Sequence, residues 1–143
     1  PYSFEHPVAY MYGIAVRPEF QGRGLGKVLM RSVWAFALGA GANEVHLSVR
    51  VTNYPSLRLM FGQGYRIIEY HERFYGPSSV ESPRVILAKR LHHIDVDFVE
   101  QRSVPIMFNG FVSAQTSDMI TSLLGQGFVG TAVSREQGLT FSR

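Results

Sequence analysis

Apolar and polar residues alternate along the first part of the chain in strand-like and helix-like segments. Residues 8–16 are rich in β-branched and aromatic side chains, as is typical of a strand. From about residue 24 to about residue 38, apolar residues recur at helical spacing. The predicted buried stripe of this helix consists of Leu25, Val28, Leu29, Val33 and Phe36. Gly39 and Gly41 are expected to end it.

The following segments repeat this alternation. Strands are predicted over residues 45–51, 65–74 and 85–91, with a loop over residues 76–79. Pro55 suits the first turn of a second helix, which Gly62 and Gly64 end. Strands joined by helical crossovers run parallel, whereas a closing hairpin is antiparallel. The predicted fold class is therefore α/β, with a mixed central sheet flanked by helices.

The last third of the chain has a weaker pattern. Residues 104–112 are predicted to be extended, and residues 128–133 and 139–141 to form strands. Thr116 or Ser117 is the expected cap of an intervening helix. The apolar residues of that helix are Met119, Ile120, Leu123 and Leu124.

Composition narrows the class of protein. With 143 residues, of which 45% are apolar and 17% charged, one folded domain with a sizeable core is expected. The chain has no cysteine, which excludes disulfides, thiolate metal sites and a cysteine nucleophile. No apolar run approaches the length of a membrane span, and no signal-peptide pattern opens the sequence, so a cytoplasmic protein without membrane partners is the default expectation.

The net charge of +3 does not by itself indicate a nucleic-acid partner. The arginines are scattered, and no dense run of basic residues forms a stripe. The sequence therefore predicts no nucleic-acid partner, although the basic charge keeps a nucleic-acid binder as an alternative. Arg17, Arg23 and Lys27 surround the glycine-rich turn, where a polyanionic cofactor would explain them.

Glycines alternate with other residues at Gly22, Gly24 and Gly26, between the first strand and the first helix. Such a turn can direct several backbone N–H groups at one anion, because helix N-termini have free amides and a favourable dipole. A Walker A loop would need glycine at Gln21 and Ser or Thr at Val28, and the dinucleotide fingerprint also fails in register.

The remaining pattern has Gln21, Gly24 and Gly26 after a strand end, followed by an Asn53-led helix that ends in Gly64-Tyr65. Together these motifs resemble the acyl-CoA-binding half of the GCN5-related N-acetyltransferase (GNAT) superfamily. The resemblance covers residues 8–91, without the strands and helices that usually precede them. It implies a GNAT-like core over residues 1–91 and a C-terminal α/β extension over residues 92–143, packed on the same domain.

The resemblance implies acetyl-CoA as cosubstrate. Separately, no metal site is expected, because no cluster of His, Asp and Glu residues has the spacing of metal ligands. In the family pattern, backbone groups of residues 14–16 pair with the pantetheine arm, and amides of residues 22–27 cradle the pyrophosphate. Asn53 would lie beside the pantetheine, with capping of the second helix as its equally weighted alternative. The implied cofactor-binding residues are Ile14, Ala15, Val16, Gln21, Gly22, Arg23, Gly24, Leu25, Gly26, Lys27 and Asn53.

Candidates for removing a proton from the amine are Tyr10, at a position where family members place a Glu or Tyr, and His46 on the next strand. His46 has the better intrinsic pKa for a base, though a structural role is the alternative. Glu19 and Glu44 are expected at the surface. The family's general-acid Tyr falls on Met60, which cannot donate a proton and whose alternative role is packing; Tyr54 and Tyr65 do not match that position.

Phe74-Tyr75 resembles an aromatic pair that lies beside the acceptor peptide in protein N-terminal acetyltransferases, with a half-buried strand as its alternative. The leading hypothesis is an N-acetyltransferase acting on a small-molecule amine or a peptide N-terminus. The alternative is a non-catalytic acyl-CoA-binding or interaction module. Sheet edges exposed by half a fold predict a homodimer.

Overall fold

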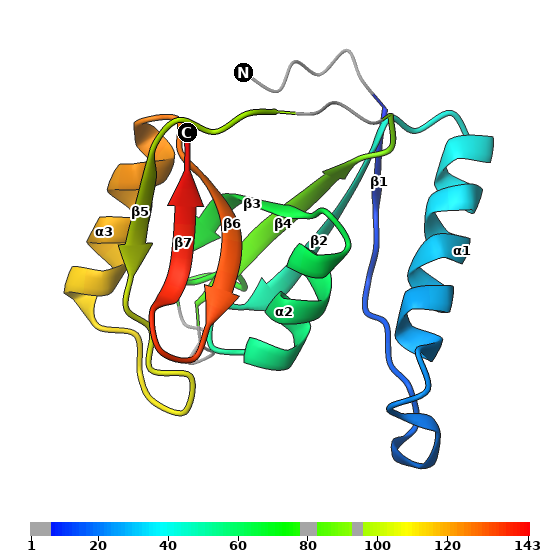
Figure 1. The fold of residues 1–143 in the computed structure, drawn as a ribbon, viewed down its shortest axis with the longest axis horizontal. Helices are drawn as coiled ribbons and strands as arrows, with labels where there is room; N and C mark the ends of the chain where they lie inside the picture. Colours follow the sequence, from blue (N-terminus) through cyan, green and yellow to red (C-terminus); the bar gives the residue numbers. More distant parts are fainter. Residues whose placement is uncertain (1–6, 78–82, 93–95) are drawn as a thin grey trace. The chain divides into compact units, whose positions relative to one another are not determined.

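The computed structural model describes residues 7–77, 83–92 and 96–143 (Figure 1). The chain divides into two compact units, the first made of residues 1–47 and 88–94 and the second of residues 48–87 and 95–143. Residues 78 and 79 of the predicted loop lie outside the described residues. The predicted boundary at residue 91 stays a prediction.

The described residues form a mixed α/β structure, which confirms the predicted fold class (Figure 1). The strands are hydrogen-bonded in the order β1-β2-β4-β3-β6-β7-β5, and β2 and β4 contribute residues to both units. The strands are β1 (Val8–Tyr10), β2 (Glu44–Arg50), β3 (Arg66–His71), β4 (Arg84–Arg90), β5 (Gln101–Val104), β6 (Val129–Ser134) and β7 (Gly138–Ser142). The helices are the 3-10 turn η1 (Pro18–Phe20), α1 (Leu25–Gly39), α2 (Tyr54–Gly62) and α3 (Ala114–Gly125).

The first unit pairs β1 with β2 in parallel and carries α1. β1 is much shorter than the strand predicted over residues 8–16, because it leaves β2 after the Met11 amide donates to the His46 carbonyl at 2.8 Å. Residues 11–17 therefore run alongside no partner strand among the described residues. This departure sets the geometry of the glycine-rich turn that follows.

The buried stripe predicted for α1 is wrong. Phe36 is 80% exposed and Val28 56%, whereas Met30 and Ala37 are buried. Buried Met30 and Ala37 each lie one position after an exposed residue of the predicted stripe, Leu29 and Phe36, which is a rotation of about 100°. Because α1 is apolar on both faces, its periodicity does not specify which face turns inward within the unit.

The second unit contains the antiparallel strands β6, β7 and β5, and β6 also pairs antiparallel with β3 (Figure 1). α2 contacts β6, while α3 contacts β3 and β5. The core of this unit consists of fully or almost fully buried side chains, among them Leu57, Tyr65, Ile67, Leu87, Val104, Ile120, Phe128, Leu139 and Phe141. The helix and strands predicted for residues 117–141 are confirmed in kind.

Two details of the tail differ from prediction. α3 begins earlier than expected, because Ser113 rather than Thr116 or Ser117 caps it: the Ser113 hydroxyl accepts from the Thr116 amide at 3.1 Å. β5 lies before the extended segment predicted over residues 104–112. Pro105 follows its last residue and, lacking an N–H, cannot continue the ladder.

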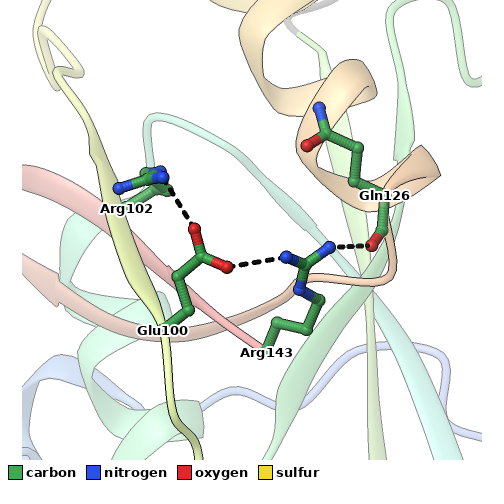
Figure 2. Close-up of polar contacts among 4 residues, drawn as sticks. All are labelled: Glu100, Arg102, Gln126 and Arg143. Atoms are coloured by element: carbon green, nitrogen blue, oxygen red, sulfur yellow. Dashed lines mark hydrogen bonds and ion pairs between the residues drawn. The ribbon is translucent and has the colours of Figure 1, made fainter.

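A surface network joins β5, the chain end and α3 (Figure 2). Glu100 accepts from Arg102 at 2.6 Å and from Arg143 at 2.7 Å, and Arg143 also donates to the Gln126 carbonyl at 3.1 Å. Exposed ion pairs contribute little energy individually, so the network mainly fixes the position of the last residue. Separately, none of the helices within the described ranges has the length and apolar character needed to cross a membrane.

Candidate functional site

The segment between β1 and α1 presents backbone groups without protein partners. Within the described part of the chain, neither Ile14 nor Ala15 forms a backbone hydrogen bond. Val16 is held differently, because its carbonyl accepts from the Gln21 side-chain amide at 2.9 Å. An extended ligand with amide groups can therefore pair with this segment as a neighbouring strand would.

The turn after this segment is shaped by η1 and two glycines with positive φ. Gly22 and Gly24 have φ of 78° and 76°, a region that L-residues adopt only at a cost. A Cβ at either position would meet no atom within 4 Å, so backbone conformation, not crowding within the protein, requires glycine here. The Arg23 guanidinium lies 5.8 Å from the centroid of the Phe20 ring.

The N-terminus of α1 is uncapped by any side chain. Gly24 occupies the N-cap position, and the first bond back to it comes from the Val28 amide at 3.3 Å. The amides of Leu25, Gly26 and Lys27 consequently have no acceptor among the described residues. Free amides at the positive end of a helix dipole form a favourable anion site.

Three exposed basic side chains surround this turn, namely Arg17, Arg23 and Lys27. None of them forms an ion pair with a carboxylate of the described ranges. The turn thus combines free amides with uncompensated positive charge, as a pyrophosphate requires.

Both residues predicted for proton removal lie in the first unit. Tyr10 and His46 are register partners in the parallel pair of β1 and β2, so their side chains leave the same face of the two strands. The Tyr10 ring packs on the Tyr12 ring with centroids 4.7 Å apart, which confirms that these tyrosines share a face. The structure therefore brings Tyr10 and His46 next to each other in the ladder.

Glu44 is not the surface residue that was expected. It is only 8% exposed, and its carboxylate lies 2.8 Å from Nε2 of His46 and 3.5 Å from Nε of Arg90. A carboxylate beside one ring nitrogen fixes the orientation of a histidine ring. The two-residue spacing of Glu44 and His46 along a strand was the available signal. Glu19 is exposed, as expected.

Asn53 belongs to the second unit, where it caps α2 by accepting from the Ser56 amide at 3.2 Å. The capping role is thus observed, and it uses only the side-chain oxygen. Met60 is 3% exposed and Tyr65 is fully buried, so both pack in the core of this unit. Met60 therefore has the packing role that was its alternative.

The aromatic pair Phe74 and Tyr75 follows β3, with ring centroids 5.0 Å apart. The Arg84 guanidinium lies 5.9 Å and 5.4 Å from these two rings. Arg84 also donates to the Ser48 hydroxyl at 3.1 Å. Tyr75 is 61% exposed and Phe74 is half-buried, so Tyr75 contributes most of the aromatic surface that the pair presents.

The fold and the turn together define a class: an α/β protein with an amide cradle, suited to an anion, at a helix N-terminus. Residues 1–65 match the sequence model of the acetyltransferase (GNAT) family. Over these residues the chain is similar to the GNAT acetyltransferase family, which confirms the resemblance that the sequence motifs indicated.

Similar proteins agree with this assignment. The chain is 32% identical over 82 residues to N-alpha-acetyltransferase RimI of Mycobacterium tuberculosis, covering 57% of this chain and 47% of that protein. It spans 21% of a second curated relative, from Mycobacterium leprae, so it corresponds to half or less of their length.

Solved structures show the same fold. A GNAT acetyltransferase from Elizabethkingia anophelis with acetyl-CoA bound matches with a TM-score of 0.55 and 19% identity, covering 62% of this chain and 64% of that one. Naa20 of Chaetomium thermophilum, in complex with a bisubstrate analogue, matches with a TM-score of 0.52 and 26% identity, covering 57% and 45%.

Proposed function

We propose that the protein is an acetyl-CoA-dependent N-acetyltransferase that transfers the acetyl group to a primary amine. The observation that carries the proposal is the amide cradle at Leu25, Gly26 and Lys27, in a segment that matches the GNAT family. The backbone groups of Ile14 and Ala15 would hold the pantetheine arm. The Gln21 side chain would hold the backbone segment and the amide cradle together, because its amide donates to the Val16 carbonyl.

In the proposed reaction, the amine nitrogen attacks the thioester carbonyl carbon, the C–S bond breaks and the thiolate leaves. The amine must lose a proton, and His46, supported by Glu44, is the proposed acceptor, directly or through a water. Tyr10, beside His46 in the ladder, would position the amine or that water. Met60 can donate no proton, so the thiolate would be protonated by solvent.

The proposed acceptor is a peptide N-terminus, with a small-molecule amine as the second option. The Phe74–Tyr75 pair, with its exposed Tyr75 ring, supports a peptide, as does the name of the RimI relative. Incubation with acetyl-CoA and either short peptides with free N-termini or a panel of small amines tests this. The proposal predicts amine-dependent release of free CoA, lowered at least tenfold in His46→Gln and faster with peptides.

A non-catalytic acyl-CoA-binding module is the second candidate function. One observation favours it: Met60, which is buried and can donate no proton, stands where the family pattern has its proton donor. This reading predicts binding of acetyl-CoA and no CoA release with any amine, so the same assay distinguishes the two.

We further propose a homodimer. Phe36 and Val28 of α1 are exposed, and β1 is an edge strand among the residues that the structure describes. Such apolar surface and a free edge favour association. Sedimentation of the wild type should give a dimer that Phe36→Glu converts to a monomer; a monomeric wild type would contradict this. The domain division at residue 91 and the cytoplasmic location stay predictions.

A further inference from the structure

The second unit contains a cavity of about 470 Å³ that the family resemblance does not account for. It lies between the start of α2, at Tyr54 and Pro55, and the segment after β5, at Ile106 to Phe108. Arg135, from the turn between β6 and β7, also lines it. A volume of this size suits a small molecule or one or two residues of a peptide.

Aromatic and aliphatic side chains form one part of the cavity wall, and the polar residues Thr52 and Asn109 line it as well. Tyr54 and Phe108 meet edge to face, with ring centroids 5.1 Å apart. Ile106 is buried beneath them, whereas Met107 is 71% exposed and has a side chain that adapts easily to a ligand. These side chains provide an apolar surface on which a hydrophobic group can pack.

One cation faces this apolar surface. The Arg135 guanidinium lies 4.3 Å from the centroid of the Tyr54 ring. Stacking uses the face of the guanidinium and leaves its N–H edges available. Arg135 has no carboxylate or carbonyl partner within the part of the chain that the structure describes. The guanidinium is therefore held in place by stacking on Tyr54, and its N–H groups remain available to bind an anion.

The start of α2 offers no free backbone amide to an anion in the cavity. Around the start of α2, the Tyr54 amide donates to the Thr52 carbonyl, Pro55 has no N–H, and the Ser56 amide donates to Asn53. No further donor of the helix start is free, unlike at α1. A phosphate needs several donors, whereas a carboxylate is satisfied by one bidentate guanidinium.

From these observations we infer that the cavity binds a carboxylate attached to an apolar or aromatic group, with the carboxylate on Arg135 and the apolar group against Phe108 and Ile106. Two sources share this chemistry: a free small carboxylic acid, and the C-terminal carboxylate of a peptide. The inference concerns binding in the second unit and does not depend on acetyl transfer.

Calorimetric titration of the full chain with two matched pairs of probes tests this. The first pair is 3-phenylpropanoate and its neutral amide, and the second is the peptide Ala-Ala-Phe with a free or an amidated C-terminus. If the site recognises any carboxylate with an apolar group, both carboxylates are expected to bind. If it also recognises the peptide backbone, only the peptide with a free C-terminus is expected to bind. The neutral amides should bind at least about tenfold more weakly, and high salt should weaken only the carboxylates.

Variants locate the site. Arg135→Gln should remove the preference for the carboxylate, and Arg135→Lys should retain part of it, because Lys keeps the charge and loses the bidentate geometry. Arg58→Gln, an exposed arginine of α2 in the same unit, is the matched control and should bind like the wild type. Unfolding curves verify that each variant is folded. Absence of binding by both carboxylates, equal binding of acid and amide, or an unchanged preference in Arg135→Gln would overturn the inference.

Discussion

Replacing Gly24 with alanine separates the stability of the turn from its ability to bind a phosphate. Gly24 has a φ of 76°, and a Cβ there would meet no protein atom within 4 Å. The cost to folding is therefore only that of a left-handed L-residue, about 1–2 kcal/mol. The same Cβ would lie next to the free amides of Leu25 and Gly26, where a phosphate must approach the backbone closely.

Gly41 provides a matched control in the same unit. Its φ is 85°, and the space around it is also open, but it lies beyond the other end of α1. Gly41→Ala should consequently lose the same ~1–2 kcal/mol of unfolding free energy. Because it leaves the cradle intact, its affinity for acetyl-CoA should equal that of the wild type.

Denaturant unfolding measures the stability of both variants, and calorimetric titration with acetyl-CoA measures their affinity. The expected result is equal destabilisation, with affinity lost by at least about tenfold only in Gly24→Ala, a loss equivalent to ~1.4 kcal/mol of binding free energy. If Gly24→Ala binds acetyl-CoA like the wild type, or if Gly41→Ala loses binding equally, the amide cradle is not the cofactor site.

Other predictions concern the second unit. Gly130→Ala should destabilise by about 1–3 kcal/mol in denaturant unfolding, because its Cβ would lie 2.6 Å from Cβ of Ile67 in the paired strand; an unchanged midpoint would contradict this packing. Ser113→Ala should cost about 1 kcal/mol by removing the α3 cap, whereas Ser113→Asn should retain most of the stability. Burial raises the pKa of Tyr70 above its ordinary value, an effect partly offset by the hydrogen bond to Ser117 and reinforced by Glu72. The resulting stability is present below the unfolded-state pKa near ~10 and is lost as pH rises through the folded-state value, so Tyr70→Phe should flatten that alkaline decline; an equally steep decline would refute it.

The turn was predictable because its signals are local. Gly22 and Gly24 both have positive φ, a backbone conformation that glycine adopts without steric cost. Asn53 followed by Pro55 likewise predicts the start of α2. In the structure the side chain of Asn53 caps this helix. Each of these features depends on a few consecutive residues.

Features that depend on distant residues were not predictable in the same way. α1 is apolar on two faces, and burial of Met30 rather than Phe36 is decided by packing within the unit. Glu44 is buried because Arg90 and His46 lie beside it, and Arg90 comes from a strand far along the chain. The cavity at Arg135 joins three separate segments, so no local pattern indicates it.

The central claim is that the chain binds acyl-CoA through its amide cradle and backbone segment. Thermal unfolding with acetyl-CoA, free CoA or ATP tests it most directly. At about 100 times the dissociation constant, binding should add ~2.7 kcal/mol to the unfolding free energy, an easily measured rise in midpoint. The account predicts this rise with acetyl-CoA and CoA and none with ATP. No rise with either CoA species, or an equal rise with ATP, would contradict it.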